Sequence, residues 1–169
     1  MSVTKTLKDT KYKLYDKWNL YYHLPDNKNW DLSSYTIILN KLSTIEEVVS
    51  VNCKIGGHII VNTMLFLMRD NITPRWEDEK NRNGGCFSFK VSNKNADQVW
   101  KNLFYLTCGE SLLKKNNECV NGITISPKKH FCIVKIWLDN TQIQDPNMIV
   151  PIDNVSIQGC LFKKHEPEF

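Results

Sequence analysis

The sequence predicts an α+β fold in which one antiparallel β-sheet is covered by helices on a single face. Two observations predict it. Several short segments alternate apolar and polar residues, as strands with one buried face do, and they follow one another in hairpin order. One longer segment, 96–107, instead repeats its apolar residues at helical spacing. No repeat, low-complexity block or Gly/Ser-rich linker divides the chain, which indicates one domain.

The expected strands share an alternation that places apolar side chains on one face of the sheet. In the segment 86–91, the two phenylalanines and the valine lie on one face, whereas the serine and the lysine lie on the other. The strands predicted in this way are 18–23, 35–39, 64–69, 86–91, 123–126, 131–138 and a last one near 160–162. The turn at 127–130 should join two of them in a hairpin.

Two helices are expected between these strands. Ser43 and Glu46 have the spacing of a capping box, so a short helix should begin there and run to about Asn52. The longer helix, 96–107, has a continuous apolar face that must pack against the sheet. Its buried face is predicted to comprise Ala96, Val99, Trp100, Leu103, Phe104 and Thr107, and its outer face Gln98, Lys101, Asn102 and Tyr105.

Length and composition fit a single folded domain. The chain has 169 residues, of which 41% are hydrophobic and 24% charged. We expect a flexible arm over residues 1–16, which are rich in lysine, and one domain over 17–169. The longest apolar run, 64–68, is too short to cross a membrane, and the first residues lack the apolar core of a secretory signal. We therefore expect a cytoplasmic protein, monomeric by itself, that does not bind membranes.

Charge and cysteine content narrow the classes of function. The net charge of +4 is below the excess typical of proteins that bind duplex DNA without sequence preference, but it suits a protein that holds one small polyanion. The six cysteines include no Cys-x-x-Cys pair, which favours free thiols over a zinc site. Neither Gly-Gly pair, 56–57 or 84–85, is followed by a helix signal. We therefore expect neither a metal nor a cofactor.

The five tryptophans fall into two groups. Trp100 lies on the apolar face of the long helix and Trp18 begins a strand, so both are expected in the core. Trp30 and Trp76 instead lie in polar loops, where large aromatic side chains are good candidates for ligand recognition. Alternatively, such a tryptophan can fold back over the edge of a core, and the acidic residues after Trp76 can form a solvated charged run.

The carboxylate that follows one of these loop tryptophans suggests a particular ligand. Two indoles can enclose a flat ring, and Glu77, directly after Trp76, can accept two N–H groups at the edge of that ring. Guanine presents such a pair of donors, N1–H and N2–H₂. A positively charged ring would also be attracted to both indole faces by cation–π interactions. The combination favours binding of a guanine-type base.

The sequence around these loops resembles the eukaryotic translation initiation factor 4E family, the mRNA cap-binding proteins. Trp76-Glu77-Asp78-Glu79-Lys80-Asn81, followed by Gly84-Gly85, resembles the signature loop of the family. Further segments match in the same order. They are 17–22 (the first strand), 28–30 (the first stacking loop), 44–47 and 99–110 (the two helices) and 136–137 (a strand end). The resemblance covers roughly residues 12–140, with a weaker match to His165, so the chain resembles a divergent member.

The resemblance implies a curved sheet with helices on its convex face and a pocket for the mRNA cap on its concave face. Trp30 and Trp76 would stack on the two sides of 7-methylguanine. Glu77 would accept hydrogen bonds from N1–H and N2–H₂, and Trp137 would contact the methyl group. Capped mRNA would be the ligand and cap-dependent translation initiation the role, without enzymatic activity.

The residues expected to bind the cap triphosphate depart from the family pattern. The family has a basic residue after Gly-Gly, where this chain has Cys86, and a lysine where this chain has Ile133. Lys135 shares a strand face with Trp137 and is the preferred replacement. The candidate phosphate ligands are therefore Lys128, Lys129, His130 and Lys135. The first three can equally be a solvated hairpin turn.

The resemblance also implies that a scaffold protein of the initiation complex binds the convex face through a short helix. The exposed tryptophan that the family has in its first helix is Val49 here, and Lys101 and Tyr105 replace leucines of the second helix. Ile45 and Glu46 match the family. We expect a dedicated partner that fits Ile45, Glu46, Val49 and Tyr105, and weak binding of an ordinary scaffold peptide, although a smaller groove can still accept one.

Three other classes of function remain open at this stage. The first is a competitor or repressor that binds the mRNA cap without recruiting the scaffold. The second is an enzyme that acts on caps, which would need clustered carboxylates for metal ions or a glycine-rich cofactor turn. The third is a structural adaptor whose aromatic residues all belong to the core.

Overall fold

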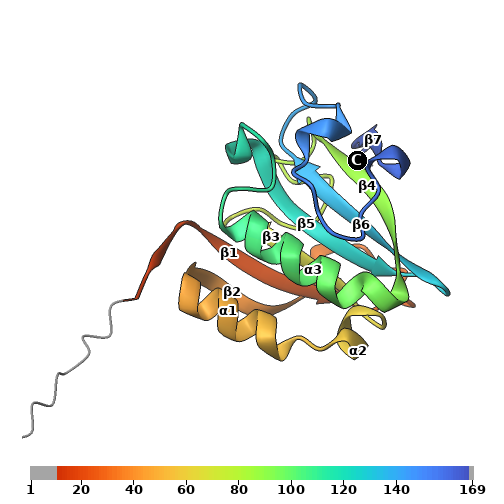
Figure 1. The fold of residues 1–169 in the computed structure, drawn as a ribbon. Coiled ribbons are helices and arrows are strands. Elements are labelled where there is room, and N and C mark those ends of the chain that lie inside the picture. The colour runs from red at the N-terminus through yellow and green to blue at the C-terminus, as the bar shows by residue number, and fades with distance from the viewer. Residues whose placement is uncertain (1–10, 168–169) are drawn as a thin grey trace, which may run out of the picture.

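The computed structural model describes residues 11–167, and in them one antiparallel sheet carries helices on one of its faces (Figure 1). Its strands are β1 (Lys13–His23), β2 (Thr36–Thr44), β3 (Met64–Arg69), β4 (Gly85–Ser92), β5 (Val120–Pro127), β6 (Phe131–Leu138) and β7 (Leu161–Lys164). They lie in the order β2-β1-β3-β5-β6-β4-β7. The predicted α+β class is confirmed, as is the hairpin between β5 and β6.

The first strand begins earlier than the sequence predicted. β1 starts at Lys13 rather than at residue 18, so residues 13–16 belong to the sheet and not to the expected arm. Residues 1–10 of that arm lie outside the described residues. Trp18 is the first residue of β1 that pairs with β3 as well as with β2. The apolar pattern therefore begins only where the strand has neighbours on both sides.

The helices α1 (Ile45–Lys54), α2 (Gly57–Ile60) and α3 (Asn93–Cys108) lie together on one face of the sheet (Figure 1). The capping box of α1 is one residue later than predicted. Thr44 accepts from the Glu47 backbone N–H at 3.3 Å, and the Glu47 carboxylate accepts from the backbone N–H groups of Thr44 and Ser43. The prediction that no helix follows Gly56 is wrong, because α2 begins directly after it.

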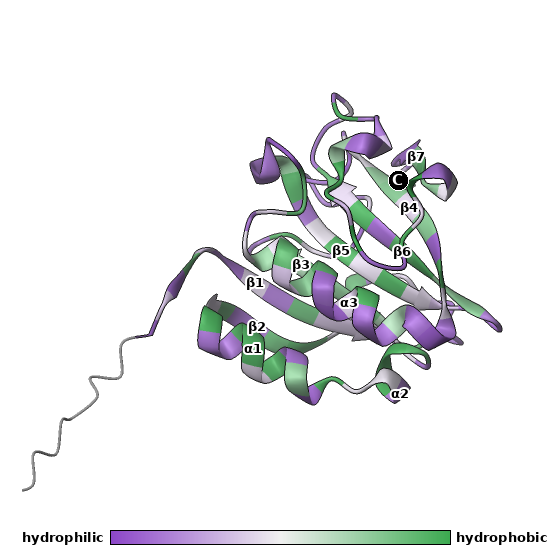
Figure 2. Ribbon diagram, in the orientation of Figure 1, coloured by the Kyte–Doolittle hydropathy of each residue, from purple (hydrophilic) through white to green (hydrophobic). Residues whose placement is uncertain are grey.

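Apolar side chains pack on both faces of the sheet, in two separate clusters. The larger cluster lies between the sheet and the helices and includes the fully buried Trp18 and Trp100, as predicted. All six residues predicted for the inner face of α3 are buried. Apolar and polar residues alternate along α1 and α3, as this packing requires (Figure 2). The smaller cluster, around Phe66, Met68 and Trp137, lies on the other face.

The second face of the sheet is where the described residues leave room for a ligand. β5 and β6 present Thr124, Ser126, Lys135 and Trp137 on this face, because residues two apart in a strand point the same way. Residues 139–160 contain only two short helical segments, the 3-10 helices Pro146–Met148 and Ile157–Gly159. Within residues 11–167, no helix is long and apolar enough to span a membrane.

Candidate functional site

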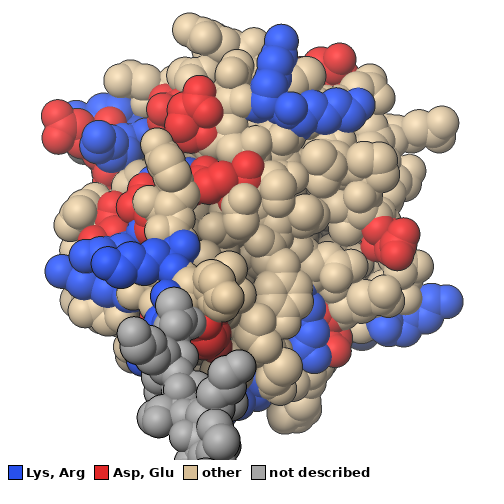
Figure 3. Space-filling view, turned by 60° about the vertical axis from the view of Figure 1, so that its left-hand side comes forward, with Lys and Arg blue, Asp and Glu red and all other residues tan. Residues whose placement is uncertain are grey.

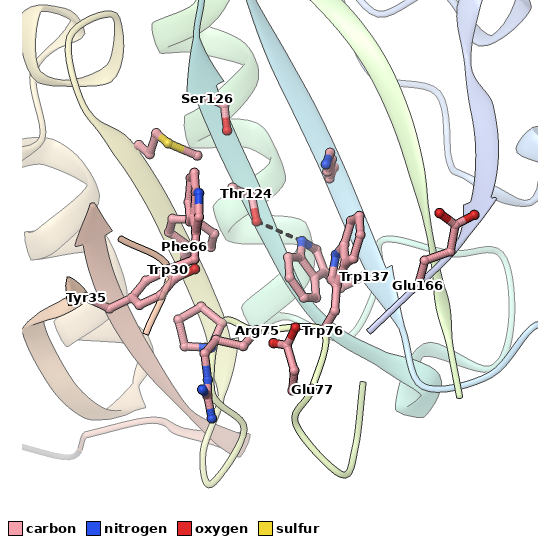
Figure 4. Close-up of a pocket in the computed structure, with 13 residues that line it drawn as sticks. Trp30, Tyr35, Phe66, Arg75, Trp76, Glu77, Thr124, Ser126, Trp137 and Glu166 are labelled. Atoms are coloured by element: carbon pink, nitrogen blue, oxygen red, sulfur yellow. Dashed lines mark hydrogen bonds between the residues drawn. The ribbon is translucent and has the colours of Figure 1, made fainter. Parts of the chain in front are cut away.

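A cavity of about 370 Å³ opens on this second face of the sheet. Trp30 lies on one side of it, and Trp76 and Trp137 lie on the other (Figure 4). The Glu77 side chain lies between the two sides, below the tryptophans in this view. Lys135 also lines the cavity. The structure thus brings together five of the residues that the sequence singled out, from positions up to 107 residues apart (137 − 30 = 107).

The Trp30 side of the cavity is formed by the loop that follows β1. Trp30 is 51% exposed, and one face of its indole stacks on the fully buried ring of His23, with centroids 4.4 Å apart and planes at 6°. His23 Nε2 lies 2.8 Å from the carbonyl oxygen of Asn29; a carbonyl only accepts, so this nitrogen donates. Within the loop, the Asn27 side chain accepts from the Asn29 backbone N–H at 2.9 Å.

The Trp76 side is formed by the loop between β3 and β4, and Asn81 fixes its shape. Asn81 is fully buried, and its side-chain amide donates to the carbonyl oxygens of Thr73 at 2.9 Å and Arg75 at 2.8 Å. Its side-chain oxygen accepts from Asn121 of β5 at 2.9 Å. Because Arg75 directly precedes Trp76, these bonds hold the indole against the sheet.

The acidic residues after Trp76 have different roles. Asp78 accepts from the Thr73 backbone N–H at 2.8 Å and the Thr73 hydroxyl at 2.6 Å, and from the Lys80 backbone N–H at 2.9 Å. Asp78 therefore stabilises the loop, and Glu79 is exposed. Glu77 lines the cavity, and among the described residues its carboxylate has neither a hydrogen bond nor an ion pair. Glu77 is the acidic residue available to a ligand.

A second buried histidine supports the Trp76 side. The His165 ring stacks on Trp76, with centroids 5.7 Å apart and planes at 14°, and its Nδ1 donates to the Asn81 carbonyl oxygen at 2.7 Å. Its other nitrogen, Nε2, is buried without a partner among the described residues. Burial lowers the pKa of His165, and the nearby ammonium of Lys135 lowers it further, against the opposing effect of the Asn81 bond. The ring is therefore neutral near pH 7.

Two more aromatic side chains complete the cavity. Trp137 is 4% exposed, and its Nε1 donates to the Thr124 hydroxyl at 2.8 Å, which fixes the indole on the sheet. Tyr35 lies between Trp30 and Phe66. Burial, and then the negative charge of Glu77, raise the pKa of Tyr35 to about 12, so its hydroxyl keeps its proton at neutral pH.

The predicted phosphate ligands are not all at the cavity. Lys135 lines it, whereas Lys128, Lys129 and His130 are exposed at the turn between β5 and β6 and are not among the lining residues. Charges of both signs are interspersed around the margin of the face shown in Figure 3, without one large patch of a single sign. Of the four predicted phosphate ligands, Lys135 is therefore the one that the structure places at the cavity.

The predicted partner residues lie on the opposite side of the sheet, on the helices. Ile45 and Val49 of α1 and Tyr105 of α3 are exposed. Glu46 is also exposed, and its carboxylate accepts from the Tyr12 backbone N–H at 3.1 Å. Lys101 is paired with Asp97 at 3.0 Å, which neutralises part of its charge. These residues are independent of the cavity.

Several residues of the site were not singled out from the sequence. They are His23, Tyr35, Phe66, Arg75, Thr124, Ser126, Lys163 and Glu166. Strand alternation could have identified Thr124 and Ser126, because they lie on the face of the hairpin that carries Trp137. His23 and His165 carry no such signal, because their roles depend on stacking with Trp30 and Trp76 in the folded chain. Within the described residues, no group of three or more His, Cys, Asp or Glu side chains could hold a metal ion.

Comparison with known proteins agrees with this geometry. The sequence model of the family described as eukaryotic initiation factor 4E matches residues 13–163. This chain is 31% identical over 136 residues to eukaryotic translation initiation factor 4E of Eremothecium gossypii, a match over 76% of this chain. The chain belongs to the eukaryotic initiation factor 4E family. It spans 63% of the length of the Eremothecium gossypii relative.

Solved structures of the 4E family share the fold. The Caenorhabditis elegans eIF4E-3 complex with the 4E-binding protein Mextli and a cap analog superposes with a TM-score of 0.74 at 20% identity, over 92% of this chain and 94% of that one. Ascaris suum eIF4E-3 with m7G cap superposes with a TM-score of 0.69 at 22% identity, over 79% and 76% of the two chains. These 4E neighbours confirm the curved sheet with helices on its convex face.

Proposed function

We propose that this chain binds the 7-methylguanosine cap of mRNA in the cavity and acts in the cytoplasm in cap-dependent translation initiation. One observation carries the proposal. Trp30 and Trp76 flank a cavity of about 370 Å³ whose edge holds a carboxylate, Glu77, without a partner among the described residues. The names of the relatives, and the m7G cap in the Ascaris suum complex, support the same ligand.

In this proposal each residue has a defined role. Trp30 and Trp76 stack on the two faces of the base, and Glu77 accepts hydrogen bonds from N1–H and N2–H₂. Trp137, fixed by Thr124, contacts the methyl group. Stacking contributes about 1–3 kcal/mol per base, and a hydrogen bond to a charged group about 1.5–3 kcal/mol. Together they support micromolar binding, about 8 kcal/mol, after the costs of association.

A fluorescence titration tests the proposal. Quenching of tryptophan fluorescence by 7-methylguanosine triphosphate should saturate, with weaker quenching by GTP, which lacks the positive charge on the base. ATP should bind least, because adenine lacks the two donors that face Glu77. If the methylated analogue does not quench, the aromatic residues serve only the core and the proposal is wrong.

Glu77→Gln tests the role of the carboxylate directly. The substitution turns one acceptor into an amide that faces the donors of guanine, and a buried donor left unpaired costs about 1–3 kcal/mol. We expect about tenfold or greater loss of affinity for the methylated analogue. Glu79→Gln, two residues along in the same loop and exposed, is the matched control and should bind normally. Equal affinities of the two variants would contradict the role of Glu77.

The alternatives are separated by activity and by partner binding. A cap-processing enzyme would release a product from capped RNA, and we expect none, because the proposed role is binding. A competitor or repressor would bind the cap analogue equally well but would inhibit translation when it is added to a capped-message extract. A translation initiation factor would instead restore translation in an extract depleted of its own cap-binding factor.

We propose in addition that a scaffold protein of the initiation complex binds the exposed side chains of α1 and α3. An exposed indole at the centre of such a groove typically contributes at least about 2 kcal/mol to binding. Val49, which occupies that position here, has no indole. Lys101 adds a charge that an apolar helix would have to desolvate. Calorimetry should therefore show weak binding of an ordinary scaffold peptide, and Val49→Trp should strengthen it. Tight binding by the wild type would show that these substitutions do not matter.

A further inference from the structure

Two lysine side chains lie beside Trp76, and the sequence had pointed to only one of them. The Lys135 ammonium lies 5.7 Å from the centre of the Trp76 ring, and the Lys163 ammonium lies 5.9 Å from it. Lys135 belongs to β6 and Lys163 to β7, and β4 lies between these strands. The two positive charges therefore lie near the same ring although their strands are not neighbours.

Strand register explains why both lysines lie on the face of the sheet that carries the cavity. Cys86 of β4 pairs with Trp137 on one side and with Lys163 on the other, and directly opposed residues share a face of the sheet. Trp137 lines the cavity, and Lys135, two residues before it, lies on the same face. Lys164 pairs with Gly85 and points to the opposite face. Lys163 is thus the lysine of β7 on the ligand side.

The ammonium groups of Lys135 and Lys163 both act electrostatically on the thiol of Cys86. Burial raises the pKa of the Cys86 thiol, whereas Lys135 and Lys163 lower it. Lys163 forms an ion pair with Glu166 at 3.4 Å, and both side chains are more than half exposed. An exposed pair of this kind contributes little to stability, so a ligand can displace the carboxylate. Lys135 has no ion pair within the described residues.

We propose that Lys163, together with Lys135, binds the phosphate chain of the ligand whose base stacks between Trp30 and Trp76. This inference rests on the proposed function. A phosphate chain carries several negatively charged oxygens, so it can accept charge-assisted hydrogen bonds from both ammonium groups. Cys86 provides no positive charge, and Lys163, its register partner, supplies one from the next strand. Glu166, which lines the cavity, is the carboxylate that the phosphates would replace at Lys163.

The experiment compares 7-methylguanosine monophosphate with the triphosphate, by fluorescence titration of the full chain at low salt. Lys163→Gln keeps the stem of the side chain but removes its charge, and it should lower the ratio of triphosphate to monophosphate affinity about threefold to fivefold. Lys164→Gln, on the other face, is the matched control and should leave the ratio unchanged. The difference between the two variants should shrink as salt is raised.

Two further variants sharpen the test. Glu166→Gln removes the competing carboxylate and should strengthen triphosphate binding. Cys86→Lys in the Lys163→Gln background moves the charge to the neighbouring strand and should restore the ratio. If Lys163→Gln weakens both analogues equally, or neither, the lysine only covers the Trp76 ring and the inference is wrong. Failure of the wild type to bind either analogue would instead overturn the proposed function, and this inference with it.

Discussion

The two loops that flank the cavity differ in how they are held. The Trp30 loop is fixed by bonds within itself, and one buried ring, His23, lies behind its indole. The Trp76 loop is tied to two other parts of the chain. Asn81 accepts from Asn121 of β5, and its carbonyl oxygen accepts from His165, which directly follows β7. One side of the site is local, whereas the other depends on the whole sheet.

Because of this difference, we expect the two loops to contribute differently to ligand binding and to folding stability. The Trp30 indole is half exposed, so the loop can adjust to a ligand at little cost in packing. Trp76 lies against His165, with two lysines beside the ring, so its position is set before the ligand arrives. The preorganised Trp76 side loses little conformational entropy on binding, whereas the adjustable Trp30 side lets the ligand enter. We therefore expect equivalent losses of binding at the two tryptophans but different losses of stability.

The largest expected effect is the loss of ligand binding on removal of either indole. Trp30→Ala and Trp76→Ala each remove one face of the sandwich, at least about 1–3 kcal/mol, and should abolish detectable retention on a cap-analogue resin. Both variants should fold. Trp76→Ala should have the lower melting temperature, because it uncovers His165. Normal retention of either variant would contradict the stacking role, and equal melting temperatures would contradict the difference between the loops.

A smaller effect is expected when the hydrogen bonds of each loop are removed. Asn81→Ala removes three hydrogen bonds, to the carbonyl oxygens of Thr73 and Arg75 and from the side-chain amide of Asn121, each worth about 0.5–1.5 kcal/mol. We expect a free energy of unfolding lower by at least about 2 kcal/mol and weaker binding of the cap analogue.

Asn27→Ala is the matched control in the other loop, because it removes an exposed bond worth about 0.5–1.5 kcal/mol at most. Urea unfolding of both variants gives the comparison. Similar losses for the two variants would mean that the Trp76 loop is not held more firmly than the Trp30 loop.

The same contrast shows what the sequence could and could not predict. Alternation and helical spacing identified the sheet, the helices and the two loop tryptophans, because burial on one face leaves a periodic pattern. The separate roles of Glu77 and Asp78 could not be predicted, since adjacent carboxylates look alike until the loop is folded. Lys163 was missed for a related reason. Its position beside Trp76 depends on the register between β4 and β7, in which Cys86 pairs with Lys163, 77 residues later (163 − 86 = 77). No sequence periodicity indicates that register.

The smallest expected effect is a pH dependence that belongs to the Trp76 side alone. Burial lowers the pKa of His165 in the folded protein, so below about pH 6.5 the unfolded chain binds a proton more readily than the folded one. The contribution of this ring to stability is therefore complete above about pH 6.5 and decreases as the pH falls. Protonation would also place a second positive charge near Lys135, which already opposes it.

His165→Phe keeps a flat ring behind Trp76 without a titrating group, and His130→Gln, at the exposed hairpin turn, is the control. Free energies of unfolding measured at pH 7.5 and pH 5.5 should fall less for His165→Phe than for the wild type, whereas His130→Gln should follow the wild type. The Phe ring cannot donate to the Asn81 carbonyl, so this variant should be less stable at both pH values, and only the difference between them is diagnostic. An unchanged difference would show that His165 does not resist protonation, and the Trp76 side would then share the simpler support of the Trp30 side.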